Sequence, residues 1–319
     1  MVAVALGVGG GALLATYGGR AAASQTPSPP AKATDPASAV RGFLQALARG
    51  DAGAALAYGQ TQPADASYLN ADILATALKA NPITEINVPP VPTSSDQTPT
   101  IEASYKIGSE RITGRFDTVL VGDIYQLKKT TSDLDVASLR SARVPLVISG
   151  QTVDSDTVTV LPGAYLVTSG LTYLDWGPDN TLLIKEPDSF VPTSDLQETI
   201  TDAGVTAFTQ AVKASLTGCL KIKSNQPSGC PFKYTTTGYK IDPKTVIWSL
   251  TEDPMTGFDP TLSSTKPGVG TGSLSLNLQM KATATSTYDH KKQIINQAVF
   301  SSATVSADLT KDSVTVTWT

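Results

Sequence analysis

The sequence predicts an α+β protein in which two domains, each made of helices and a curved antiparallel sheet, flank a small all-β module. Apolar residues recur at helical spacing before residue 80 and again after residue 200. Each helical stretch is followed by runs in which apolar and polar residues alternate. Helices followed by strands, rather than a regular alternation of the two, are typical of α+β folds. The segment between the two units is rich in strand and turn patterns.

The composition indicates a folded protein that works outside the cytosol. Of the 319 residues, 40% are apolar, which is enough for hydrophobic cores, while only 16% are charged. Gly, Pro, Ser and Thr are plentiful, as expected for strands and loops on an extracytoplasmic surface. The net charge is −4, and Lys and Arg are scattered rather than gathered in a basic stripe. We therefore expect no nucleic-acid partner.

Residues 1–19 are predicted to be a transmembrane anchor or a signal segment, followed by a linker over residues 20–34. Residues 2–17 are uncharged and almost wholly apolar or small. As a helix they would reach roughly 24 Å, short of the ~30 Å hydrocarbon core. No Lys or Arg precedes them, which is explained if Met1 is an internal start. We favour a retained anchor over a signal cleaved after residues 21–23, and both place the bulk of the chain outside the membrane.

The same opening stretch fits a second pattern. Gly7, Gly9 and Ala12 match G-x-G-x-x-A after an apolar run, the fingerprint of dinucleotide-binding folds. That fingerprint requires a helix directly after the glycines and an acidic residue about 20 positions on. Here the run leads into a Pro/Ser/Ala-rich tether instead. We interpret the match as a coincidence of small residues and expect no cofactor.

The first domain is predicted over residues 35–133. Asp35 can cap a helix with Pro36 at its first position, and apolar residues then fall on one face until Gly50 stops the helix. A short second helix follows, and a third runs near residues 70–80. Alternating patterns over residues 98–130 predict an antiparallel sheet.

The middle module is predicted over residues 140–193. A Pro-Gly turn at residues 162–163 is expected to precede a strand, and residues 171–187 are expected to form a hairpin with Pro178, Asp179 and Asn180 at its tip. No chemistry is visible in this stretch. We expect a spacer or brace between the flanking domains.

The second α+β domain is predicted over residues 194–319. Ser194 and Gln197 have capping-box spacing before a helix with one apolar face. Strands are expected near residues 245–251, 273–284, 292–308 and 313–318. Residues 253–272 are rich in Gly and Pro, and a loop of that length suggests a function or mobility; we favour a bare mobile loop.

Cys219 and Cys230 are the two cysteines, and Pro227 and Gly229 can turn the chain between them. A zinc site needs four ligands, commonly in close pairs, and a redox pair is usually C-x-x-C. Because one histidine is present and the spacing is wide, we expect no metal site. A structural disulfide is the favoured interpretation, stabilising by roughly 3 kcal/mol on the chain-entropy model. Two unpaired buried cysteines are the alternative.

No reactive constellation is visible. His290 is the sole histidine and lies in YDHKKQ, a polar stretch that looks like a hairpin tip. A nucleophile–His–Asp arrangement needs an imidazole beside the nucleophile. P-loop and metalloprotease motifs are absent, and carboxylates are scattered rather than paired. We therefore predict no catalytic residues.

The segment DPASAVRGFLQALARGDAGAALAY, residues 35–58, resembles the opening of a nuclear transport factor 2-like domain. The third helix and the strands over residues 70–130 are similar too. The whole arrangement, with LTGCL…PSGCPF at residues 216–232, resembles membrane-anchored secreted proteins of actinobacteria that have no assigned function. The resemblance implies cone-shaped domains that enclose an apolar pocket.

Two functions follow as hypotheses. The first is a non-enzymatic binding or scaffold protein of the cell envelope, tethered to the membrane, that holds a small apolar ligand or an envelope protein partner. The alternative is a secreted isomerase or dehydratase, because some members of the resembled family use a Tyr and an Asp in the cone; fold analogy alone is a weak warrant for it. The candidate cone-lining residues here are Tyr68, Asp72, Tyr105, Asp117 and Tyr125.

Overall fold

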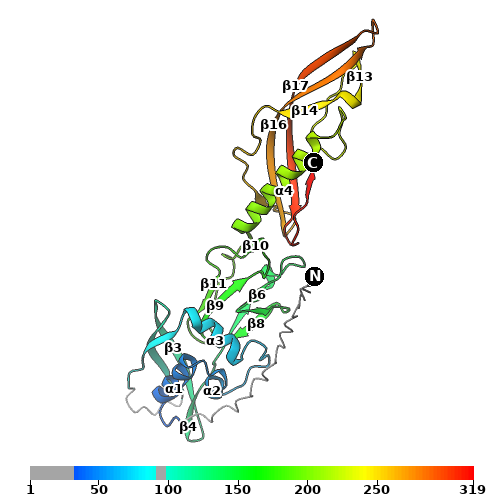
Figure 1. Ribbon diagram of the computed structural model, residues 1–319. Coiled ribbons are helices and arrows are strands. Elements are labelled where there is room, and N and C mark those ends of the chain that lie inside the picture. Colours follow the sequence, from blue (N-terminus) through cyan, green and yellow to red (C-terminus); the bar gives the residue numbers. More distant parts are fainter. Residues whose placement is uncertain (1–31, 91–97) are drawn as a thin grey trace, which may run out of the picture.

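The computed structural model describes residues 32–90 and 98–319 and has two bodies set end to end in an elongated molecule (Figure 1). The N-terminal body, residues 32–200, holds three helices and many short strands. The C-terminal body, residues 201–319, holds one long helix beside a long β-hairpin. Curled antiparallel sheets dominate both, so the α+β prediction is confirmed. The predicted anchor, residues 1–19, and residues 20–31 of the linker lie outside the described residues.

Three helices open the N-terminal body where the sequence predicts them: α1 (Pro36–Ala48), α2 (Ala52–Ala57) and α3 (Ala71–Ala80). Each is capped by a side-chain oxygen. Asp35 accepts a hydrogen bond from the Ser38 N–H at 2.8 Å, and Asp51 and Asn70 cap α2 and α3 in the same way. The apolar face of α1 is wholly buried.

A four-stranded antiparallel meander packs against α1. Its strands follow one another in the order β1 (Ile83–Asn87), β2 (Thr100–Ile107), β3 (Glu110–Val121) and β4 (Ile124–Leu127). Alternate residues of β2 are buried, as the alternating sequence predicts: Ile101, Ala103, Tyr105 and Ile107. One face of this sheet therefore forms the core beneath α1 and the other faces water.

The middle of the chain folds into three small sheets. Its strands are β5 (Ser132–Asp135), β6 (Val147–Ile148), β7 (Gln151–Thr152), β8 (Thr157–Val160), β9 (Gly163–Thr168), β10 (Leu174–Asp175), β11 (Thr181–Ile184) and β12 (Thr199–Ile200), with a 3-10 turn at Ala137–Leu139. The turn at residues 162–163 precedes β9, as predicted. The hairpin predicted over residues 171–187 is wrong, because β11 pairs with β9 while β10 pairs with β12.

The long helix α4 (Asp202–Leu220) begins later than the sequence suggests. The capping box predicted at Ser194 and Gln197 is wrong: the N-cap is Thr201, whose hydroxyl accepts a hydrogen bond from the Gly204 N–H at 3.0 Å. The physical reason is β12, which lies between the two positions and is held in an extended conformation by β10.

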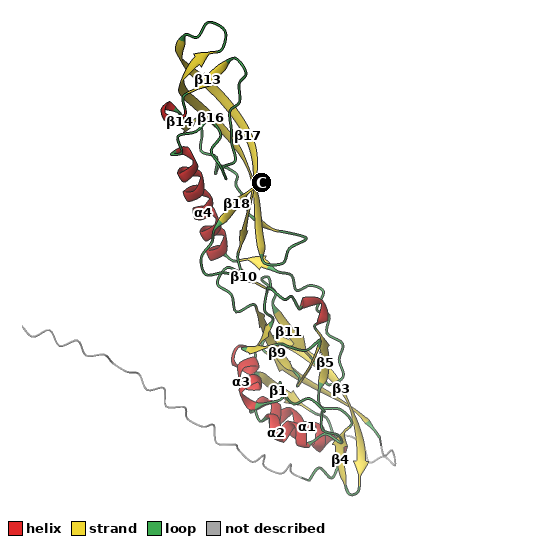
Figure 2. Cartoon of the chain, turned by 90° about the vertical axis from the view of Figure 1, so that its right-hand side faces the viewer, coloured by secondary structure: helices red, strands yellow, loops and turns green. Residues whose placement is uncertain are grey.

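A six-stranded sheet completes the C-terminal body: β13 (Tyr239–Ile241), β14 (Ile247–Leu250), β15 (Thr261–Leu262), β16 (Val269–Ser286), β17 (Lys292–Asp308) and β18 (Val316–Trp318), with a 3-10 turn at Pro243–Thr245. The hairpin of β16 and β17 runs the length of this body, and α4 lies along one of its faces (Figure 2). The segment 253–272, expected to be a bare loop, contains β15 and the start of β16. Its Phe258 packs edge-to-face on Phe208 of α4, with ring centroids 5.8 Å apart.

The buried apolar side chains of residues 32–90 and 98–319 form two hydrophobic cores. One lies between α1, α2 and the β1–β4 sheet. The other begins at α3, passes through the middle sheets and continues without a break into the space between α4 and the long hairpin. Helix α3 contributes to both, with Leu74 in the first and Ile73 in the second.

Candidate functional site

Tyr105 is the deepest of the five candidate cone residues. It is buried in the first core, tilted against Phe116 with ring centroids 6.3 Å apart, and Phe116 in turn meets Phe43 edge-on at 6.2 Å. The Tyr105 hydroxyl donates a hydrogen bond to the main-chain oxygen of Lys185. Burial, and secondly the charge of Glu186, raises the pKa of Tyr105 well above its usual range. The ring therefore fills the interior with its own apolar surface.

Tyr68 and Asp72 belong to other surroundings. The Tyr68 side chain is packed in the second core, and its hydroxyl donates a hydrogen bond of 2.6 Å to the main-chain oxygen of Thr152. Partial burial raises the pKa of Tyr68, with a smaller contribution from Asp154. Asp72 is exposed on α3, in a shallow depression beside Lys79.

Asp117 and Tyr125 lie at the margin of the first core. Asp117 is exposed on β3, where its carboxylate accepts a hydrogen bond of 2.5 Å from the Thr100 hydroxyl. Tyr125 on β4 is half-buried against the core. The structure thus brings none of the four other candidates beside the Tyr105 hydroxyl.

Glu186 was not among the candidate residues chosen from the sequence. It is the carboxylate whose charge acts on the Tyr105 phenol. It is half-buried and follows β11, and its side chain accepts a hydrogen bond from the main-chain N–H of Arg115 on β3. About eighty positions separate Tyr105 from this segment, and neither stretch carries a motif. Only the packing of the middle module against the first sheet brings the two together.

Two of the surface depressions carry distinct chemistry. One, of about 440 Å³, is lined by charges of both signs that include Arg115, Lys128 and the ion pair of Lys129 with Asp188. The other, of about 550 Å³, lies beside the disulfide loop and is lined by Phe300 of β17 and Trp318 of β18.

Cys219 and Cys230 form the predicted disulfide, with their Cα atoms 5.7 Å apart. The loop that the disulfide closes is pinned to the sheet. Trp248 of β14 donates its indole N–H to the main-chain oxygen of Ser224 at 2.8 Å and lies 4.8 Å from the Phe232 ring. The Ser301 hydroxyl of β17 donates to the main-chain oxygen of Pro231 at 2.6 Å. The disulfide is therefore a structural brace that holds a cover on the inner face of the long hairpin.

His290 lies exposed in the turn between β16 and β17, with a positive φ of 58°. In residues 32–90 and 98–319, no three His, Cys, Asp or Glu side chains gather in a way that could hold a metal ion. None of the described helices has the length and apolar character needed to cross a bilayer.

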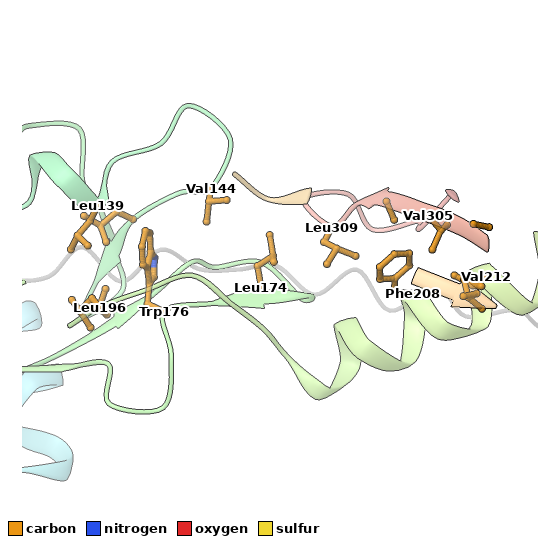
Figure 3. Close-up of a cluster of buried hydrophobic side chains, with 14 of the residues drawn as sticks. Leu139, Val144, Leu174, Trp176, Leu196, Phe208, Val212, Val305 and Leu309 are labelled. Carbon is orange, nitrogen blue, oxygen red and sulfur yellow. The ribbon is translucent and has the colours of Figure 1, made fainter. Parts of the chain in front are cut away.

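The joint between the two bodies is a continuous apolar contact. Val144 and Leu174 of the N-terminal body point toward Leu309 and Phe208 of the C-terminal body, and all four side chains are buried (Figure 3). Trp176 lies behind them, with its indole N–H donating to the main-chain oxygen of Pro145 at 3.3 Å. The second core therefore crosses from one body to the other without a polar layer.

Polar contacts surround this apolar centre. The Gly268 N–H donates to the Glu198 carboxylate at 3.2 Å, and the Gly268 carbonyl accepts from the Leu309 N–H at 2.9 Å. The Tyr173 hydroxyl donates to the main-chain oxygen of Asp312 at 2.9 Å. The Thr201 hydroxyl donates to the Thr172 carbonyl at 2.9 Å. The joint is thus fixed on several sides.

Compared with protein-family models, with curated proteins and with solved structures, the chain has no match. The resemblance to nuclear transport factor 2-like domains therefore stays a prediction.

Proposed function

We propose that this chain is a non-enzymatic extracytoplasmic scaffold, tethered to the membrane through residues 1–19, that holds its C-terminal sheet at a fixed distance and orientation for an envelope protein partner. One observation carries the proposal: a single apolar core runs through the joint and makes the two bodies one arm. A hinge between independently moving domains would present smaller and more polar surfaces to each other.

Residues 35–133 are proposed to form a nuclear transport factor 2-like domain. Three helices in succession and a curled four-stranded antiparallel meander packed on α1 support this proposal. In such a domain a ligand would lie between helices and sheet. Here Tyr105, Phe116 and Phe43 pack on one another in that space. The packing favours a protein partner over a small apolar ligand.

The alternative, an isomerase or dehydratase, would need a phenol and a carboxylate that face a substrate together. Tyr105 and Glu186 come nearest to such a pair. The Tyr105 hydroxyl is already bonded to the Lys185 carbonyl, and the Glu186 carboxylate to the Arg115 N–H. Both groups are engaged in holding the middle module onto the first sheet, so we do not propose this function.

Pulsed electron-spin resonance on the full chain tests the rigid arm. Nitroxide labels are attached at two exposed positions, one on each body, through Asp154→Cys and Lys213→Cys. A stiff joint gives one narrow distribution of distances between the two labels. Leu174→Ala opens a cavity at the centre of the joint and should broaden that distribution. A distribution in the parent chain as broad as that of the Leu174→Ala variant would overturn the proposal.

A further inference from the structure

The outer edge of β17 is open over most of its length. β17 pairs with β16 in unbroken register from Lys292 to Asp308. On its other side, β18 reaches only residues 305–307, with Thr319 adding two main-chain hydrogen bonds to Thr304. In the described part of the chain, no strand lies beside the eleven residues from Lys292 to Ser302.

The direction of the free main-chain groups follows from Thr304. Its N–H donates to the Thr319 carbonyl at 3.2 Å and its C=O accepts from the Thr319 N–H at 2.9 Å, so both groups point to the outer edge. Because an antiparallel strand directs alternate residues to alternate sides, the even-numbered residues 294 to 302 direct their main-chain groups the same way. These groups form a ladder ready for another strand.

This edge lacks the features that normally prevent pairing. Natural edge strands are protected by charges, prolines or bulges. Between residues 293 and 307 the sequence has no charged residue and no proline, and the register has no bulge. On the face of the sheet that points away from α4, called the outer face below, Ile294 and Phe300 are each 69% exposed. A strand paired along this edge would remove part of this apolar surface from water, which is favourable.

We propose that a second copy of this chain pairs antiparallel along this edge, with the two-fold axis at Gln297. In that register Lys292 lies opposite Ser302 of the second copy, so the whole open edge is used on both sides. Ile294 then lies opposite Phe300 on the outer face, and Ile295 opposite Val299 on the inner face.

The choice of a second copy rests on two features that agree. Pairing the two ends of the open edge, Lys292 with Ser302, fixes one register. The same register places apolar residues opposite one another on both faces of the sheet. It also opposes Lys292 to a serine and not to another lysine, so no like charges meet. A closed two-fold dimer with one self-complementary patch results. The inference goes beyond the scaffold function and does not depend on it.

The expected affinity is modest. A standard interface uses roughly 20–30 residues a side, and the open edge of β17 supplies eleven. We therefore expect dimers to form in the micromolar range and to join two antiparallel arms through one continuous sheet, with the two N-terminal bodies at opposite ends.

Cysteine cross-linking of the full chain tests the register. At the axis, residue 297 faces its own copy in a non-hydrogen-bonded pair, where Cα atoms are about 4.5 Å apart and a disulfide can form. Gln297→Cys should give a covalent dimer on mild oxidation, with Cys219–Cys230 intact by mass. Ser302→Cys is the matched control, because the two copies of residue 302 would be about 33 Å apart. Equal cross-linking of both variants, or none in a folded Gln297→Cys chain, overturns the proposal.

Sedimentation of the full chain in detergent tests the same interface without an introduced cysteine. The parent chain should shift from monomer to dimer as its concentration rises, and Phe300→Lys should remain monomeric. Ser275→Lys, on the same outer face but on β16, is the control and should dimerise as the parent does. A dimer that Phe300→Lys leaves unchanged assembles through another surface, and this result, like a parent chain that stays monomeric, overturns the inference.

Discussion

The guanidinium Nη2 of Arg143 lies 2.8 Å from the carboxylate Oδ2 of Asp308, and this ion pair joins the two bodies at the rim of their apolar joint. Arg143 comes from the segment before β6 and Asp308 from the last residue of β17. The Asp308 carboxylate also accepts hydrogen bonds from the N–H and hydroxyl of Thr310, at 3.1 and 2.6 Å. One carboxylate thus links the N-terminal body to the turn that follows the long hairpin.

We expect Asp308 to make the joint acid-sensitive. Partial burial opposes ionisation, but the Thr310 hydrogen bonds and the charges of Arg143 and Lys311 outweigh it and lower the pKa of Asp308. A carboxyl with a lowered folded-state pKa stabilises above its unfolded pKa of about 3.9, and this stabilisation is lost as the pH falls through the folded value. Because both side chains are partly exposed, we expect a contribution under about 1 kcal/mol.

Urea unfolding of the parent chain and of Asp308→Asn, followed from pH 7 downward, measures this contribution. The variant should be less stable at neutral pH, and the difference should close in acid. A difference that stays constant with pH would show that Asp308 acts through packing and not through its charge.

Gly268→Ala should destabilise the joint. Gly268 has a φ of 74°, and an added Cβ would lie 2.4 Å from the Thr310 methyl carbon and 3.2 Å from a Val144 methyl carbon. Gly257 has a φ of 76° with nothing within 4 Å of an added Cβ, so Gly257→Ala is a matched control for the backbone strain alone. Strain of this kind costs of order 1–3 kcal/mol. We expect Gly268→Ala to lose more free energy of unfolding in urea than Gly257→Ala, and equal losses would contradict the contact.

The elements of the fold were predictable where they rest on local chemistry. The cap at Asp35, the alternation along β2 and the bounds of β17 are each evident in a single stretch of sequence. The errors have a common cause. Segment 171–187 looks like a hairpin locally, but its strands pair with β9 and β12, which lie elsewhere in the chain.

The joint could not be predicted for the same reason. Val144, Leu174, Phe208 and Leu309 are ordinary apolar residues in four separate segments, and only their meeting gives them a role. The candidate cone residues show the converse. Analogy with the resembled family suggests a Tyr/Asp pair. In the structure the Tyr105 hydroxyl instead donates a hydrogen bond to the Lys185 carbonyl, a contact that no sequence motif indicates.

Removing the disulfide should loosen the cover on the long hairpin without unfolding the N-terminal body. Eleven positions separate Cys219 from Cys230, and closing a loop of this size stabilises by about 3 kcal/mol on the chain-entropy model. The double variant Cys219→Ser/Cys230→Ser should unfold at lower urea concentration. Hydrogen exchange should rise first at Trp248 and in residues 224–234, whereas the amides of β2 should keep their protection. A uniform rise across both bodies would contradict a local brace.

The deeply buried tyrosines Tyr105 and Tyr165 should make the protein sensitive to alkali. Burial raises the pKa of Tyr105 and of Tyr165, and for Tyr105 the charge of Glu186 adds to the effect. In the unfolded chain a phenol releases its proton near pH 10. The folded chain holds both protons to higher pH, so the stability present below pH ~10 falls as the pH rises above it.

Tyr105→Phe and Tyr165→Phe should each flatten that fall in urea unfolding, while Tyr288→Phe, at a 96% exposed position, is the control. At neutral pH Tyr105→Phe should cost about 1 kcal/mol, because the Lys185 carbonyl loses its donor. If Tyr105→Phe left the alkaline slope unchanged, the phenol would have to be open to solvent, and a pocket beside Glu186 would need to be considered in place of a filled core.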